Sequence, residues 1–205
     1  MAEAMTAVEH KGIDAQRGDI GVPRIPGEVG IWVFVLGDML IFALFFATFM
    51  YSHHVNQARF AHDHDSLLVS LGTLNTVLLL TSSLLVAVGV AKVLNGNHSG
   101  TSRLFLCALG CGVSFVVVKA VEWTRLFTEG KTVGTGEYFS YYFMFTGIHL
   151  GHVVIGLAVL ARLAALAAQP ALSSPNVRAC ETGGIFWHMV DLLWVVLFAL
   201  FYLVR

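Results

Sequence analysis

Five long apolar blocks dominate this chain of 205 residues, and they restrict its fold more than any other feature. They lie at about 29–52, 67–92, 103–127, 138–166 and 183–204. Each block is long enough to cross the hydrocarbon core of a bilayer as a helix, which takes about 20 residues. The connections between the blocks contain the Gly, Pro, Asn and Ser residues that break or cap helices. The pattern predicts an all-α integral membrane protein, a bundle of five transmembrane helices.

The composition supports this class and argues against others. Of all residues, 57% are hydrophobic and only 12% are charged, about half the charge of a typical soluble domain. Strands of a membrane barrel would instead alternate apolar and polar residues in short segments. The formal net charge of −1, without any basic stripe, indicates no nucleic-acid partner. The three cysteines form no redox or zinc motif.

Residues 1–28 form a polar leader that lacks the short apolar core and cleavage site of a secretory signal. We expect a cytoplasmic tail here, followed by the five-helix domain at 29–205. Basic residues set the orientation of membrane helices. The N-terminal side would carry Lys11, Arg17, Arg24, Lys92, Arg103, Arg162 and Arg178, and the opposite side Arg59, Arg125, Lys131 and Arg205. This excess predicts a cytoplasmic N-terminus and an external C-terminus.

Every predicted helix carries at least one polar or ionisable residue within its apolar run. Such groups are costly in lipid, so they should face the bundle interior and find partners there. They are Asp38, Asn75, Lys119, Glu122, His149, His152, His188 and Asp191. Six of them form i,i+3 pairs, each on one helix face. Together they predict a shared polar seam. Nearby glycines should allow close helix approach: Gly37, Gly72, Gly147, Gly151 and Gly156.

The same residues allow a second interpretation, a carboxylate–histidine metal site. Its ligands would come from Glu122, His149, His152, His188 and Asp191. Di-iron bundles repeat Glu-x-x-His on two helices, and neither of the last two blocks contains that motif. A haem-copper core needs more membrane-embedded histidines than the three present here, and a single haem between His149 and His188 is a minor alternative. We therefore favour internal hydrogen bonding.

The connection HHVNQARFAHDHD, after the first block, is a separate candidate for binding a divalent ion. Its candidate ligands are His53, His54, His62, Asp63, His64 and Asp65. We expect a solvated turn on the outer side of the membrane, with adventitious zinc or nickel binding at most.

Several stretches occur in an order that is typical of one family. The last block contains WHMVDLLWVVLF, and the preceding block contains TGIHLGHVVIG. LNTVLLLTSS and KAVEW follow the same order earlier in the chain, and Glu181 stands seven residues before His188. Over about residues 27–205 these motifs resemble the cytochrome c oxidase subunit III family, with its W-H-F-V-D-x-V-W and T-G-F-H-x-x-H-V-x-x-G signatures.

The resemblance implies a supporting subunit that binds no redox metal. The haem, with copper or iron, would belong to a catalytic oxidase or reductase subunit beside it in the bacterial cytoplasmic membrane. Family members also hold phospholipids and sustain proton uptake and turnover. Carried over by position, the acids of the family fall on Asp38, Glu122 and Glu181, and its histidines fall on His149, His152 and His188. His188 and Asp191 would then join the last helix to the preceding one.

The chain resembles the five-helix short form of the family and departs from it at two places. Asp38, in GDMLIF, stands where many members have a glutamate. Together with PGEVGIWVF, this form is similar to members associated with nitric oxide reductase. Arg162 falls about one turn from the arginine that holds lipid phosphate in the family.

A transporter is the alternative from another functional class. It would use Asp38, Lys119 and Glu122 to move protons or a small solute. The chain has no internal inverted repeat and no proline-interrupted helix pair at mid-membrane depth, which many transporters have. The sequence therefore favours a supporting subunit of a respiratory oxidase or nitric oxide reductase.

Overall fold

The computed structural model describes residues 26–55, 68–96, 99–169 and 172–203. These form α2 (Val29–Val55), α4 (Val69–Leu94), α5 (Thr101–Thr128), α6 (Glu137–Ala167), α7 (Ser174–Phe198) and the π-helical turn η1 (Ala199–Leu203). Five helices are long and apolar enough to cross a membrane. The predicted all-α membrane architecture is confirmed. The first 25 residues lie outside the described ranges. So do four of the candidate ligands for a divalent ion, His62, Asp63, His64 and Asp65.

The last helix begins earlier than the sequence analysis placed it. It starts at Ser174, whereas the apolar block suggested a start near residue 183. Ser173 has extended backbone angles at the N-cap position, and Pro175 lies in the first turn. Proline is favoured there because the first helical N–H groups have no partner within the helix. The polar residues that follow, including Glu181, are therefore helical and not part of a loop.

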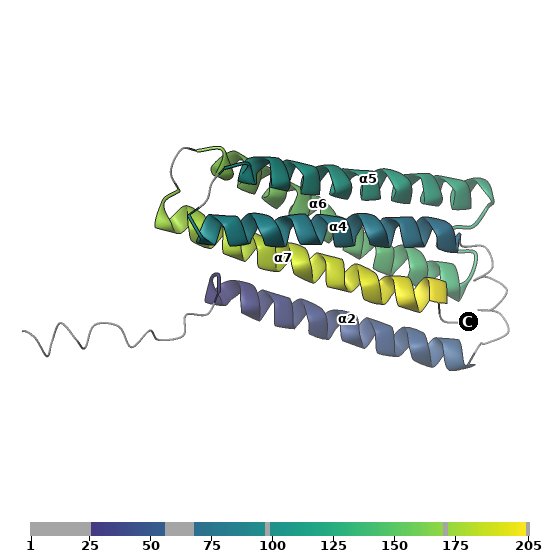
Figure 1. Cartoon of the computed structure of the whole chain (residues 1–205). Coiled ribbons are helices and arrows are strands. Elements are labelled where there is room, and N and C mark those ends of the chain that lie inside the picture. Colours follow the sequence, from purple (N-terminus) through teal and green to yellow (C-terminus); the bar gives the residue numbers. More distant parts are fainter. Residues whose placement is uncertain (1–25, 56–67, 97–98, 170–171, 204–205) are drawn as a thin grey trace, which may run out of the picture.

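Four of the helices form a closed bundle, and the fifth lies outside it. α4 packs against α5 and α7, and α6 packs against the same two helices. α2 lies alongside α7 at one side of the bundle (Figure 1). Within Ser174–Leu203, 61% of the most apolar 18-residue stretch is buried, against 6% in Val29–Val55. α7 is thus the central helix, and α2 is the peripheral one.

Glycines set the close contacts inside the four-helix bundle. A Cβ atom at Gly156 would lie 2.6 Å from Cζ3 of Trp187, and one at Gly72 would lie 2.8 Å from the ring of Tyr202. These two positions confirm the predicted role of glycine in close helix approach. Gly37 and Gly151 do not, because no heavy atom lies within 4 Å of a Cβ built there. The prediction failed at these two since both sit on outward-facing surfaces.

Polar contacts at its start, together with aromatic packing farther along, attach α2 to its neighbours. The backbone N–H of Gly27 donates to Oε2 of Glu181 over 3.3 Å, and the N–H of Glu28 donates to Oγ1 of Thr182 over 3.2 Å. Farther along, the ring of Phe49 meets that of Phe201 at 4.9 Å between centroids. These contacts hold α2 along the side of α7 without enclosing it.

Candidate functional site

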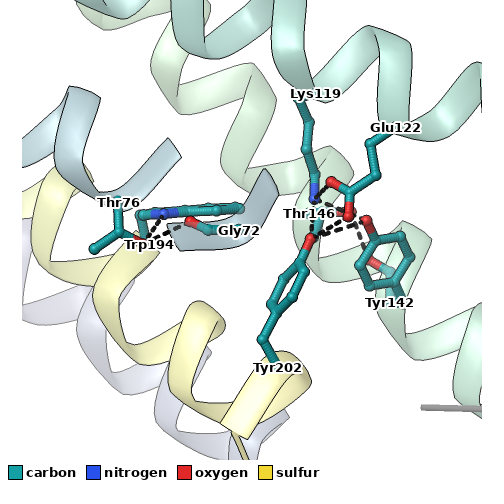
Figure 2. Close-up of polar contacts among 8 residues, drawn as sticks. All are labelled: Gly72, Thr76, Lys119, Glu122, Tyr142, Thr146, Trp194 and Tyr202. Carbon is teal, nitrogen blue, oxygen red and sulfur yellow. Dashed lines mark hydrogen bonds and ion pairs between the residues drawn. The ribbon is translucent and has the colours of Figure 1, made fainter. Parts of the chain in front are cut away.

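The strongest polar cluster surrounds Lys119 in the bundle interior. Its ammonium donates to Oε2 of Glu122 over 2.9 Å, to the Tyr142 hydroxyl over 2.8 Å and to the Tyr202 hydroxyl over 3.1 Å. The Tyr202 hydroxyl in turn donates to Oε1 of Glu122 over 2.5 Å. Figure 2 shows the four side chains converging from α5, α6 and η1, the turn that continues α7. The lysine thus uses all three of its donors inside the protein.

Burial makes this arrangement expensive to disturb. The side chains of Lys119 and Glu122 are 1% and 3% exposed. A buried ion pair is tolerated only when its remaining hydrogen-bonding groups are also satisfied, and the two tyrosine hydroxyls do this here. The ammonium also lies 5.0 Å from the ring centroid of Trp194, within the range of a cation–π contact. The i,i+3 pair expected from the sequence is present, but the tyrosines that complete it were not predicted.

The π-helical turn explains how Tyr202 reaches the cluster. A π-turn adds a residue to the helical turn and rotates the side chains that follow, a feature often found at functional sites. In η1 the carbonyl of Phe201 accepts a hydrogen bond from the Tyr138 hydroxyl over 3.0 Å. No periodicity in the string ALFYL indicates such a turn. Sequence reasoning therefore had no signal for Tyr202.

Asp38 and His152 form a second pair, between α2 and α6. Nε2 of His152 lies 3.3 Å from Oδ1 of Asp38, and Nδ1 lies 3.0 Å from the Ile148 carbonyl. Carbonyl and carboxylate oxygens both accept hydrogen bonds, so Nδ1 carries the proton donated to Ile148. Its other ring nitrogen, Nε2, faces the carboxylate of Asp38. The contact links the peripheral helix to the bundle.

The third polar cluster places His188 and Asp191 differently from the prediction. Nδ1 of His188 lies 2.7 Å from the Ser83 hydroxyl and 3.9 Å from Oδ2 of Asp191. Ser83 belongs to α4, so this cluster joins α7 to α4 and not to α6, the preceding helix. The prediction erred because helices adjacent in sequence were assumed to share their polar contacts. Trp194 likewise contacts α4, donating to Oγ1 of Thr76 over 3.1 Å (Figure 2).

His149 and Asn75 are buried without hydrogen bonds. Their side chains are 1% and 0% exposed, and their polar atoms find no bonding partner in the part of the chain that the structure describes. Aromatic rings enclose His149: its centroid lies 5.5 Å from that of Trp194 and 5.8 Å from that of Phe115. The predicted seam is therefore divided into separate clusters by aromatic packing.

The metal-site interpretation gains no support from this geometry. Among the described residues, no group of three or more His, Cys, Asp and Glu side chains is placed to hold a metal ion. The five candidate ligands from the sequence are divided among the Lys119, His152 and His188 clusters and the isolated His149. Glu181 lies apart from them near the start of α7, where it accepts the Gly27 N–H.

These features define a class of protein: a multi-pass helical membrane protein with a buried, fully paired charge cluster inside its bundle. Residues 24–204 match the family model for cytochrome c oxidase subunit III. The chain therefore belongs to the cytochrome c oxidase subunit III family, and the resemblance drawn from its motifs is confirmed.

Relatives from bacteria and archaea agree with this assignment. The chain is 29% identical to cytochrome c oxidase subunit 3 of Corynebacterium diphtheriae, with 87% of this chain and 88% of the relative covered. It is 26% identical to quinol oxidase subunit 3 of Bacillus spizizenii, with 85% of each chain covered. Against haem-copper oxidase subunit I+III of Aeropyrum pernix it is 28% identical, covering 89% of this chain but only 23% of that longer protein.

Subunit III of haem-copper oxidases is a non-catalytic subunit, and the alternative of a transporter finds no support in these comparisons. None of the three relatives is named as part of a nitric oxide reductase. The association with that reductase, suggested by Asp38 in GDMLIF, stays a prediction.

Proposed function

We propose that this chain is the subunit III component of a bacterial haem-copper oxidase complex. In this proposal it packs beside the catalytic subunit in the cytoplasmic membrane and supports assembly and sustained, proton-coupled turnover. The haem, with copper or iron, belongs to the partner. The observation that carries the proposal is the family match over residues 24–204, which includes all five helices.

The fused relative supports association with a catalytic subunit. One polypeptide of Aeropyrum pernix is named subunit I+III, and this chain matches about a quarter of it. Two parts that are joined in one chain must assemble in the same membrane. We infer the same association between this chain and a catalytic subunit that is a separate chain. The basic-residue count supports an N-terminus in the cytoplasm and a C-terminus outside.

A pocket beside α2 supports the proposed retention of phospholipid. Its volume is about 360 Å³, and it lies between the start of α2, the second half of α6 and the start of α7. The lining is apolar except for Glu28, Arg162 and Thr182. Arg162 would contact the phosphate and Glu28 the ammonium group of a zwitterionic lipid, while Ile155 and Phe186 would contact an acyl chain.

Purification from the native membrane in mild detergent tests the proposal. The tagged chain is isolated, and its visible spectrum and protein content are measured by absorption and mass spectrometry. Haem bands together with a large oxidase or reductase subunit are expected, and the identity of that subunit then names oxygen or nitric oxide as the substrate. A colourless preparation without a membrane partner would overturn the proposal.

A matched variant tests the lipid part separately. Arg162→Gln removes the charge at the pocket while keeping most of the side-chain length, and Arg103→Gln does the same on α5, away from the pocket. Fewer phospholipids per complex are expected for Arg162→Gln alone, measured by lipid mass spectrometry. Equal lipid content in both variants would contradict a lipid-binding role for Arg162.

A further inference from the structure

A pocket on the opposite side of residues 26–28 leads into the membrane interior. Its volume is about 210 Å³, room for a few water molecules at about 30 Å³ each. It begins where α4 ends and residues 26–28 cross α7, and it is lined there by Pro26, Leu94 and Glu181. It continues along α7 as far as His188, which lies about 10 Å farther along the helix axis.

His188 stands at the inner end of this pocket and touches the buried groups beyond it. Its side chain is 41% exposed and lines the pocket. Its Nδ1 atom lies 2.7 Å from the Ser83 hydroxyl and 3.9 Å from Oδ2 of Asp191. The imidazole thus has one side toward the pocket and the other toward a serine and an acid.

Asp191 lies behind His188 and is almost fully enclosed by the protein. Its side chain is 5% exposed, and neither carboxylate oxygen makes a hydrogen bond of full geometry. The Ser83 hydroxyl lies beside it as well. An isolated carboxylate at this depth in a membrane is costly, so the acid is stable here when it shares a proton with His188.

We propose that His188 and Asp191 form a proton-binding site that exchanges its proton with water through this pocket. A hydronium ion in the pocket gives its proton to Nε2 of His188 and leaves as water, the proton on Nδ1 passes to Oδ2 of the Asp191 carboxylate, and the imidazole ends neutral. A small side-chain rotation, or the Ser83 hydroxyl as a bridge, closes the distance of 3.9 Å. This deepens the proton-coupled part of the proposed function, but it does not depend on which catalytic subunit is present.

The pocket beside His188 and Asp191 is lined by few ionisable groups. The titratable groups on the pocket are Glu181 and His188, and no lysine or arginine lines it. From α4, the group facing His188 is Ser83, while Lys92 donates to the Ser99 carbonyl at the helix end. The ionisable groups of the other elements include Glu28 before α2, Lys119 with Glu122 on α5, and His149 with His152 on α6. Lys119 and His152 are held by partners already described.

Infrared spectroscopy of the full chain, purified with whatever partners it retains, tests the proposal. The spectrum is followed between about pH 5 and pH 8, where histidine-linked sites exchange protons. A carboxylic-acid or imidazolium band is expected that responds to pH and disappears in both Asp191→Asn and His188→Gln. Its absence at every pH would overturn the proposal.

Deuterium exchange then tests the route. Exchange of this band in D₂O should slow by about a hundredfold when the relay is removed in His188→Phe. Ala87→Leu, which narrows the pocket without touching the pair, should also slow it. Ala91→Leu adds the same bulk at an exposed position of α4 outside the pocket lining and should exchange as wild type does. Wild-type exchange in Ala87→Leu would overturn the route even if His188→Phe fails to fold.

The two proposals fail separately. A titrating band in a preparation without haem would leave the proton site standing and remove the oxidase assignment. A haem-bearing complex without the band would do the reverse.

Discussion

Two of the ionisable pairs within the described membrane spans, Lys119–Glu122 and Asp38–His152, are held in different ways. Lys119 and Glu122 belong to one helix of the four-helix bundle, and two tyrosines satisfy their remaining hydrogen-bonding groups. Asp38 and His152 bridge two helices at the edge of the bundle, where their side chains are 11% and 15% exposed and Oδ2 of Asp38 has no hydrogen bond. The Lys119–Glu122 pair stabilises the interior of the four-helix bundle, and the Asp38–His152 pair attaches α2 to that bundle.

The difference follows from the packing around each pair. Three helices contribute to the Lys119 cluster, so breaking it disturbs the whole bundle. The Asp38–His152 pair connects only α2 to α6, and α2 is the least buried of the helices. Polar contacts between membrane helices average only about 0.6 kcal/mol when measured by double-mutant cycles. Substitutions at the two sites should therefore differ strongly in effect.

Lys119→Met gives the largest expected effect. It leaves Glu122 buried without its cation, and breaking a buried ion pair in this way costs about 3–5 kcal/mol. We expect a large loss of thermal stability of the purified protein. The double variant Lys119→Met with Glu122→Gln should recover most of it, because no charge is then left unpaired. A single variant as stable as wild type would break the comparison on its stronger side.

Gly156→Leu tests the close packing between α6 and α7 elsewhere in the bundle. A side chain at Gly156 would overlap the ring of Trp187, and overpacking of this kind costs about 1–3 kcal/mol. Gly151→Leu is the matched control on the same helix, since its Cβ would meet open space. The melting temperature of the first variant should fall while that of the second stays the same or rises. Equal losses would mean that helix propensity and not packing decides.

Tyr202→Phe measures the contribution of the π-helical turn. It removes the hydroxyl that donates to Glu122 and accepts from Lys119, and hydrogen bonds to charged groups contribute about 1.5–3 kcal/mol. We expect a smaller drop in melting temperature than for Lys119→Met. Tyr141→Phe is a suitable control, because Tyr141 is adjacent in sequence to Tyr142 but lies outside the cluster. A loss confined to Tyr202→Phe would support the role of the turn.

The sequence was sufficient to predict the helices and the buried groups, but not their partners. Long apolar blocks locate membrane helices because the bilayer sets their length, and the bounds of the first four were close. The start of α7 was missed because its first two turns are polar. In the membrane interior an ionisable residue stands out against its neighbours, which is why Lys119, Glu122 and Asp191 could be named in advance.

Partners were harder to predict for two physical reasons. Tyr142 and Tyr202 lie in aromatic runs, where one hydroxyl gives no contrast, and a π-turn sets the direction of Tyr202. Ser83 hydrogen-bonds His188 from a helix distant in sequence, and a serine in an apolar helix is more often bonded to its own backbone. The motifs of the family indicated which positions matter without indicating which side chains meet.

Asp38→Asn tests the weaker pair. The amide keeps the shape of the side chain but cannot carry the negative charge, so the link between α2 and α6 should weaken by about 0.6 kcal/mol. We expect normal assembly and altered sustained turnover of the complex, measured as activity over many cycles. His53→Gln, at the far end of α2, provides a comparison on the same helix. Unchanged sustained activity would remove Asp38 from any functional role.

The smallest effect should come from Glu129, which follows the last turn of α5. Hydrogen bonds from Lys131 and Arg125, each 2.8 Å long, hold the pKa of this exposed carboxyl below its ordinary value. A carboxyl with a lowered pKa stabilises the fold above the unfolded-state pKa, and this stabilisation disappears as the pH falls through the folded value. Salt also screens exposed pairs.

Glu129→Gln should therefore lower the melting temperature slightly at neutral pH, and the difference should vanish in acid and shrink in high salt. Melting curves of both proteins across pH and salt measure this. For Lys119→Met, by contrast, salt should change little, because ions do not reach a buried cluster. A Glu129→Gln loss as large and as insensitive to salt as that of Lys119→Met would show that burial is not what separates strong from weak charge pairs in this protein.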